Sequence, residues 1–190
     1  MTAHLADALA PILAGRERAV LVRPGKTPAA VLVPLLAIDG EPHLLFTRRA
    51  RGLRHHEGQV AFPGGCRHPG DVDLVATALR EAQEEIALDP AAVALTGALA
   101  PVSTFVTNYR VHPFVGTVPH PGELNLKPNP TEVETVLTFS LDLLREGYEM
   151  RRLVRRGVPV NTPTYEVEGQ LIWGATARIL GDLLQRITTS

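Results

Sequence analysis

The feature that most constrains this fold is a glycine pair followed closely by a helical pattern of charged and apolar residues. Residues 62–88 begin with Phe-Pro-Gly-Gly and then repeat apolar side chains with the period of an α-helix. This spacing predicts a helix over residues 71–88, with an apolar face and with glutamates grouped on the opposite side. The apolar face contains Val75, Ala78, Leu79, Ala82 and Ile86, and the acidic group contains Glu81, Glu84 and Glu85.

The acidic group is typical either of an ordinary solvated helix face or of a metal site. Like charges one helical turn apart destabilise a helix, so three of them together favour a compensating cation. Carboxylate oxygens without a nearby thiolate or paired histidine favour Mg²⁺ or Mn²⁺ over zinc. The carbonyl of Gly64 is a candidate further ligand, because Gly64 and Gly65 lack a Cβ that would obstruct the backbone. Such a site suits attack by water on a phosphoanhydride.

Apolar and β-branched runs predict strands in much of the remaining chain, and Asp39-Gly40 predicts a hairpin between the first two. Strands outnumber helices and do not alternate strictly with them, so the pattern predicts an α/β protein with a mixed sheet. Prolines in residues 119–130 predict a long surface loop. The predicted strands are 29–38, 43–47, 59–62, 93–98, 109–118 and 133–139, with weaker candidates at 165–167 and 171–173, and further helices are predicted over 2–14 and 175–187.

Length and composition fit one domain and argue against several classes of partner. The chain has 190 residues, 45% of them hydrophobic, which is enough for one core over residues 1–190. The formal net charge of −1 provides no global positive field to bind nucleic acid. The most apolar run, 29–38, is about half as long as a membrane-spanning helix, and the N-terminus lacks the basic start of a signal peptide. We therefore expect a cytoplasmic protein, monomeric or homodimeric, that acts on a small molecule.

Residues 64–88 resemble the Nudix box. That motif reads glycine, five residues, an acid, seven residues, and then Arg-Glu-apolar-any-Glu-Glu-any-Gly-apolar. Arg80 and the three glutamates match it, whereas Ala87 stands where the family has glycine. Asp71 matches the first acid with one extra residue before Arg80, and Asp73 is the alternative match.

Residues 45–65 resemble the second signature of the coenzyme A pyrophosphatase branch of the Nudix family. In outline it reads Leu-Leu-Thr-any-Arg-Ser, a downstream Arg, a Gly, and then Val-any-Phe-Pro-Gly-Gly. Phe46 and Ala50 replace the expected Leu and Ser. The matching positions are Leu45, Thr47, Arg49, Arg54, Gly58, Val60, Phe62, Pro63, Gly64 and Gly65.

The resemblance covers about residues 29–182 and implies the Nudix fold, an α/β/α sandwich with a central mixed β-sheet. It also implies a metal-dependent pyrophosphatase that hydrolyses coenzyme A or its derivatives to 4′-phosphopantetheine and adenosine 3′,5′-bisphosphate. Two alternatives stay open. One is a Nudix hydrolase of ADP-ribose, NADH or a dinucleoside polyphosphate, and the other is a Nudix-fold module that binds a ligand without catalysis.

Roles for individual residues are expectations at this point. Glu81 and Glu85 are predicted to bind Mg²⁺ or Mn²⁺ together with the carbonyl of Gly64, and Glu84 to complete the shell or position the attacking water. Arg80 is predicted to orient Glu84.

The substrate is expected to contact a basic segment next to the glycine pair. Guanidinium groups pair with phosphate through two parallel hydrogen bonds, although a solvated basic turn is the alternative interpretation. Arg48, Arg49, Arg54 and Gly65 are the predicted substrate-binding residues. A general base outside the box is sought among Glu123, Glu132 and Glu134, with Glu132 preferred, and surface charge is the alternative for all three.

Overall fold

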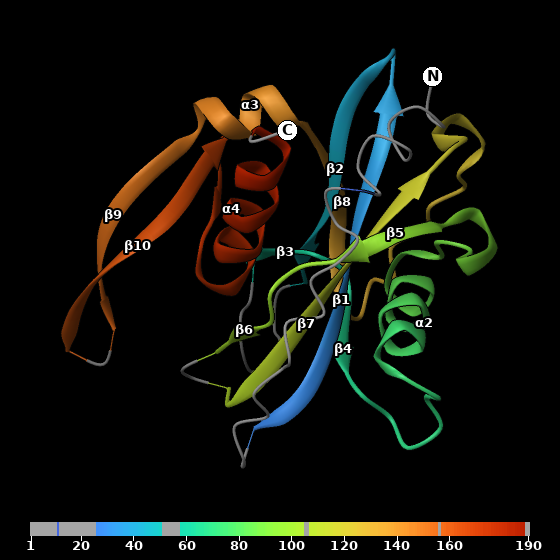
Figure 1. Ribbon diagram of the computed structural model, residues 1–190, viewed down its shortest axis with the longest axis horizontal. Helices are drawn as coiled ribbons and strands as arrows, with labels where there is room; N and C mark the ends of the chain where they lie inside the picture. Colours follow the sequence, from blue (N-terminus) through green and yellow to red (C-terminus); the bar gives the residue numbers. More distant parts are fainter. Residues whose placement is uncertain (1–10, 12–25, 51–57, 105–106, 156, 189–190) are drawn as a thin grey trace.

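A large mixed sheet lies between two helices, α2 on one side and α4 on the other (Figure 1). The computed structural model describes Pro11 and residues 26–50, 58–104, 107–155 and 157–188. The strands are β1 (Thr27–Ile38), β2 (Glu41–Arg49), β3 (Val60–Ala61), β4 (Gly64–Cys66), β5 (Ala94–Ala98), β6 (Val102–Ser103), β7 (Tyr109–Val118), β8 (Val133–Ser140), β9 (Tyr148–Arg155), β10 (Val158–Val167) and β11 (Gln170–Ile172). The helices are α2 (Leu74–Ile86), α3 (Leu141–Glu146) and α4 (Gly174–Thr188), with 3₁₀ turns η1 (Pro90–Ala92) and η2 (Pro121–Glu123).

Strand β1 is the centre of the large sheet. It pairs in parallel with β7 and antiparallel with β2 and β4, while β3 and β8 pair with β2, and β5 and β6 pair with β7. The predicted mixed sheet is therefore confirmed. The predicted hairpin is also present: Asp39 (φ 51°) and Gly40 (φ 87°) both adopt the positive φ that a tight turn between twisted strands requires.

Both faces of β1 are buried, which explains its nearly unbroken apolar sequence. Successive side chains of a strand point to opposite faces. Val33 and Leu35 join one core cluster with residues of α4, whereas Leu32 and Leu36 join a second cluster with residues of α2. The strand is therefore the common wall of two cores, one under each helix.

A second sheet and a short helix were not predicted from the sequence. Strands β9, β10 and β11 form a three-stranded antiparallel sheet, of which the predictions covered only the end of β10 and part of β11. The hairpin of β9 and β10 extends away from the large sheet (Figure 1). Exposed side chains such as Met150 and Val154, together with arginines and prolines, break the alternation that identifies a half-buried strand.

The helix predicted over residues 71–88 is shorter at both ends. It starts at Leu74, because the side chain of Asp73 accepts a hydrogen bond from the N–H of Ala76 and caps it. It ends at Ile86, because Ala87 adopts a left-handed conformation with φ 57°. The helix predicted over residues 2–14 lies outside the described residues apart from Pro11.

The proline-rich loop 119–130 folds back onto the end of α2. The N–H of Lys127 donates to the carbonyl of Ile86 at 3.0 Å, and that of Asn129 donates to the carbonyl of Glu85 at 2.8 Å. These bonds satisfy carbonyls that the last helical turn leaves without partners. Among the residues described, no helix is long and apolar enough to cross a membrane.

Candidate active site

The glycine pair lets β4 lie tightly between β1 and α2. A Cβ on Gly64, whose φ is 156°, would lie 2.3 Å from the carbonyl oxygen of Ala30. A Cβ on Gly65 would lie 2.6 Å from the carboxylate of Glu81. Side chains at these positions would therefore displace either the central strand or a glutamate of the box helix.

The backbone of Gly64 faces the box helix. The N–H of Leu32 donates to the carbonyl of Pro63 at 2.9 Å, and the antiparallel ladder places Gly64 opposite Val31. Paired and unpaired positions alternate along such a ladder, so the backbone groups of Gly64 point away from β1. Its N–H donates to Oε2 of Glu85 at 3.2 Å. The carbonyl of Gly64 therefore lies on the same side as this carboxylate.

Glu85 is buried, with 3% of its surface exposed. The prediction that all three glutamates lie opposite the apolar face is wrong for this residue. Glu85 follows Ala78 by seven residues and Ala82 by three, so the helix turns it toward the sheet. Burial raises its pKa to about 8, and the charges of Glu81 and Glu132 add to this, whereas the N–H of Gly64 and the charge of Arg49 oppose it.

Glu81 and Glu84 both contact Arg80. Oε1 of Glu81 lies 3.0 Å from Nη2 of Arg80, and Oε2 of Glu84 lies 2.8 Å from Nη1. The side chain of Glu81 is largely buried, which raises its pKa although Arg80 acts in the opposite direction. The side chain of Glu84 is half exposed. The guanidinium thus lies where the sequence predicted it, against Glu84, and it holds a second glutamate as well.

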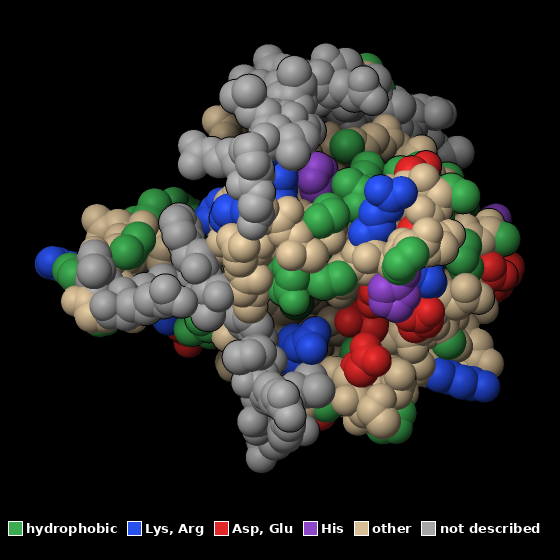
Figure 2. Space-filling model, turned by 90° about the horizontal axis from the view of Figure 1, so that it is seen from below, with side chains coloured by type: hydrophobic (Ala, Val, Ile, Leu, Met, Phe, Trp, Pro, Cys, Tyr) green, Lys and Arg blue, Asp and Glu red, His purple; other side chains and the backbone are tan. Residues whose placement is uncertain are grey.

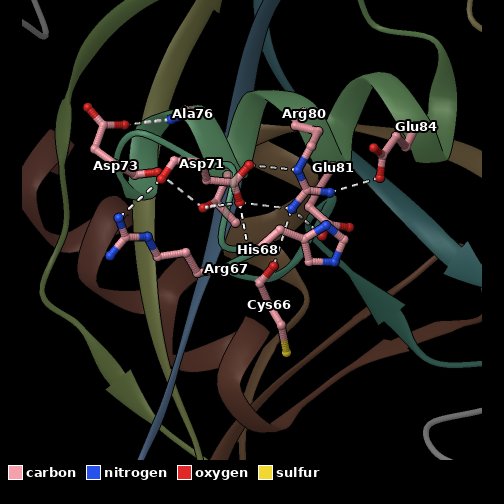
Figure 3. Close-up of polar contacts among 10 residues, drawn as sticks. Cys66, Arg67, His68, Asp71, Asp73, Ala76, Arg80, Glu81 and Glu84 are labelled. Carbon is pink, nitrogen blue, oxygen red and sulfur yellow. Dashed lines mark hydrogen bonds and ion pairs between the residues drawn. The ribbon is translucent and has the colours of Figure 1, made fainter.

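Asp71 is the acid that pairs with Arg80 (Figure 3). Nε of Arg80 donates to Oδ1 of Asp71 at 2.9 Å and Nη2 donates to Oδ2 at 3.1 Å, while Nη2 also reaches the carbonyl of Cys66 at 3.2 Å. The hydrogen bonds from Arg80 hold the pKa of Asp71 well below its usual range, and Asp71 raises the pKa of Arg80. Asp73 instead caps α2. Asp71, and not Asp73, is therefore the aspartate that contacts Arg80.

Thr77 belongs to the same cluster, although the sequence predictions did not include it. Its hydroxyl donates to Oδ2 of Asp71 at 2.9 Å, and the residue is fully buried. The available signal was a hydroxyl on a helix that otherwise buries mostly small apolar side chains, three residues before Arg80.

The neighbouring arginines Arg48 and Arg49 point in different directions. Nη2 of Arg48 pairs with Oε1 of Glu134 at 3.0 Å, and both side chains are about one-third exposed. Arg49 lies close enough to Glu85 for its charge to lower the pKa of that carboxyl. Strand alternation and a register shift against β8 between the two residues separate them. Arg54 lies outside the described residues.

Glu132 lies near the buried glutamates. Its charge raises the pKa of both Glu81 and Glu85. Its backbone is fixed on both sides, because its N–H donates to the carbonyl of Asn129 and its carbonyl accepts from the N–H of Ala50, each at 2.9 Å. The other candidate bases lie elsewhere, Glu134 against Arg48 and Glu123 in η2.

The donor set fits a divalent cation, although the glutamates face different partners. Within the part of the chain that the structure describes, no three acidic, histidine or cysteine side chains are gathered closely enough to hold a metal ion. Arg80 binds Glu81 and Glu84, while Glu85 turns to Gly64. Yet Glu85 is a buried carboxylate with two further carboxylates close by, an arrangement that a cation would stabilise. Figure 2, seen from below Figure 1, shows acidic, basic and histidine side chains near one another on the side of the molecule where α2 lies.

Similarity to known proteins agrees with this geometry. The NUDIX domain model matches residues 26–157. A protein of Photorhabdus laumondii named "Uncharacterized Nudix hydrolase NudL" is 42% identical over 161 residues, which cover 84% of this chain and 84% of that protein.

Solved structures share the fold at low sequence identity. A MutT/nudix family protein from Enterococcus faecalis has a TM-score of 0.60 at 13% identity and covers 87% of this chain and 63% of its own. A C. elegans Ap4A hydrolase, solved as a binary complex, has a TM-score of 0.51 at 18% identity and covers 60% of this chain and 80% of its own. The chain therefore belongs to the Nudix family, has the Nudix fold, and is a hydrolase of a substrate that contains a pyrophosphate.

Proposed function

We propose that this hydrolase, a single domain over residues 1–190, cleaves the diphosphate of coenzyme A or its derivatives to 4′-phosphopantetheine and adenosine 3′,5′-bisphosphate. The observation that carries the proposal is the position of Arg49. This residue belongs to the coenzyme A-type signature at residues 45–65, and its charge acts on Glu85, the buried glutamate of the box helix. The signature and the box thus meet at one place, where a guanidinium can pair with a phosphate beside the carboxylates.

Glu81 and Glu85 are the proposed metal-binding side chains, with the carbonyl of Gly64 as a further oxygen donor. Bound Mg²⁺ or Mn²⁺ would lower the pKa of a water ligand and neutralise charge on the phosphoryl oxygens. The support for this set is the burial of Glu85 beside Gly64 and the room that Gly65 leaves for Glu81. Glu84 completes the set or positions the attacking water, and Arg80 orients it through their 2.8 Å contact.

Glu132 is the proposed general base. It lies near Glu81 and Glu85, so it can take a proton from water held between these groups. Arg49 and Gly65 are the proposed substrate contacts within the described residues, and Arg54 is carried over from the signature alone. Arg48 stays a weaker candidate, because Glu134 already pairs with it.

The test is product analysis in ¹⁸O-labelled water with coenzyme A, Mg²⁺ or Mn²⁺, and the purified chain. We expect 4′-phosphopantetheine and adenosine 3′,5′-bisphosphate in equal amounts, with the label in one of the two products, which identifies the phosphorus attacked. ADP-ribose, NADH and a dinucleoside polyphosphate are assayed at the same metal concentration. A higher kcat/KM on one of these would overturn the coenzyme A assignment, and no hydrolysis of any would indicate a binding module.

The general base is tested with a matched pair of variants. Glu132→Gln and Glu134→Gln each remove one carboxylate; Glu132 directly precedes β8 and Glu134 is its second residue. We expect Glu132→Gln to lower kcat/KM about 100-fold or more, whereas Glu134→Gln keeps most of the wild-type kcat/KM. The reverse result would assign the base to Glu134.

A further inference from the structure

One oxygen of Asp71 collects three donors from different parts of the chain. Oδ2 accepts from the N–H of His68 at 2.8 Å, from the hydroxyl of Thr77 at 2.9 Å and from Nη2 of Arg80 at 3.1 Å. Oδ1 accepts from Nε of Arg80 at 2.9 Å. Both carboxylate oxygens thus accept from the planar guanidinium (Figure 3), and Oδ2 is held in addition by the N–H of His68 and the hydroxyl of Thr77.

The hydroxyl of Thr77 has a single proton and two acceptors within reach. The carbonyl of Asp73 lies at 3.1 Å and the carboxylate of Asp71 at 2.9 Å. A charged acceptor forms the stronger hydrogen bond, so the proton is directed to Asp71. Thr77 is fully buried, and water therefore cannot replace this bond if the hydroxyl is removed.

We infer that Thr77 is a positioning residue for hydrolysis, acting through Asp71 and Arg80 on Glu81 and Glu84. Thr77 fixes the carboxylate of Asp71, Asp71 fixes the guanidinium of Arg80, and Arg80 fixes the two glutamates. The inference rests on the proposed function only in that Glu81 and Glu84 take part in the reaction.

The position of Asp71 outside the helix explains why its carboxylate needs the hydrogen bond from Thr77. Asp71 precedes α2, which begins at Leu74, so helical geometry does not set its position. Thr77 lies inside the helix, and its hydroxyl therefore ties the loop acid to the rigid element that carries Arg80.

A double-mutant cycle tests whether Thr77 acts through Asp71. Thr77→Val keeps the shape and removes the hydroxyl, and Asp71→Asn weakens the pairing with Arg80. We expect Thr77→Val to lower kcat roughly 10-fold, with KM for the substrate changed less than about twofold, and Thr77→Ser to restore kcat. The double variant is expected to be no slower than Asp71→Asn alone. Independent effects that multiply would overturn the inference.

Thr164 provides a matched control. It is also fully buried, and its hydroxyl donates to the carbonyl of Glu149 at 2.9 Å, in the second sheet. Thr164→Val is expected to lower the melting temperature while kcat stays at the wild-type value. An equal loss of kcat in both threonine variants would show that the effect of Thr77 is a general loss of stability.

A third measurement needs neither metal nor substrate. The Nε–H of Arg80 donates to Asp71, so its hydrogen exchange in the metal-free protein, followed by NMR, reports how firmly the pair is held. We expect exchange to accelerate in Thr77→Val and to stay unchanged in Thr77→Ser and Thr164→Val. Unchanged exchange in Thr77→Val would overturn the relay. Should coenzyme A not be hydrolysed, the substrate assignment fails, and this measurement still decides the relay.

Discussion

Helices α2 and α4 cover opposite faces of the same sheet with similar amphipathic patterns, yet they bury different chemistry (Figure 1). The buried residues of α4 are all apolar, and its Asp182 and Arg186 pair with each other while Asp182 also accepts from the N–H of Ala100. The buried residues of α2 include a hydroxyl, Thr77, and a carboxylate, Glu85.

The difference indicates where stability and activity reside in this molecule. On α4 each charge has a partner and the core is apolar, so its side chains mainly stabilise the fold. On α2 a single guanidinium serves three carboxylates while a fourth is buried beside a backbone N–H, which raises the energy of the metal-free state.

Glu85→Gln should reduce turnover by about 10³-fold, because loss of the proposed metal contact would remove several kcal/mol of transition-state stabilisation. Asp182→Asn on α4 is the comparison. It should keep wild-type turnover while losing about 1 kcal/mol of stability from weakened hydrogen bonds. Steady-state kinetics and urea denaturation measure the two effects. Wild-type turnover in Glu85→Gln would show that the buried carboxylate of α2 is no more important for activity than the charges of α4.

The stability of the metal-free protein should fall as pH rises through the range in which Glu85 ionises. Its pKa is about 8 in the folded protein against an ordinary value of 4.5, so the folded state binds the proton more tightly. The free energy of unfolding of the wild type, measured relative to that of Glu85→Gln, should therefore decrease by a few kcal/mol between about pH 4.5 and 8. Above that range it should no longer change. Denaturation in EDTA over this pH range measures the difference. If the difference in unfolding free energy between the wild type and Glu85→Gln did not change with pH, the pKa of Glu85 would not be raised by folding.

Arg80→Lys should lower kcat about 10-fold to 100-fold, because an ammonium keeps the charge but cannot hold three carboxylates in fixed directions. Arg186→Lys on α4 replaces the same side chain in a pair with Asp182 and should leave kcat unchanged. Kinetics at saturating substrate compare the two. Equal kcat values for both variants would mean that orientation by Arg80 contributes nothing.

Ala87→Gly should stabilise the protein by about 1 kcal/mol, because the left-handed conformation at φ 57° disfavours a residue with a Cβ. Ala76→Gly, inside α2, should instead destabilise by about 0.5–1 kcal/mol. Chemical denaturation of both variants measures the difference. If Ala87→Gly and Ala76→Gly were both less stable than the wild type, the left-handed conformation of Ala87 would cost no free energy.

Strands with two buried faces and the box helix were predictable from the sequence because their patterns depend on local periodicity. The apolar run of β1 and the Asp39-Gly40 turn are examples. The hairpin of β9 and β10 was missed because it is mostly exposed and carries no clear alternation.

Within the candidate site, the spacing of the motif identified Glu81 and Arg80. It did not indicate that residues adjacent in sequence would face different partners. Arg48 and Arg49 are consecutive in sequence, and strand alternation turns only Arg49 toward Glu85. The burial of Glu85 follows from its angle on the helix, which Ala78 seven residues earlier already indicates. Thr77 is a hydroxyl among the buried positions of α2, but its role depends on Asp71, which folds back onto it from the loop before the helix.

The loop that closes over the end of α2 has a mechanical consequence for the reaction. The N–H of Asn129 donates to the carbonyl of Glu85, and Glu132, three residues later in the same segment, lies near the side chain of Glu85. Glu85 and Glu132, which are far apart in the sequence, are therefore connected through one short segment of main chain. Under the proposed function, inserting or deleting a residue in this segment should change the separation of the proposed metal ligand and the proposed base, and so lower turnover.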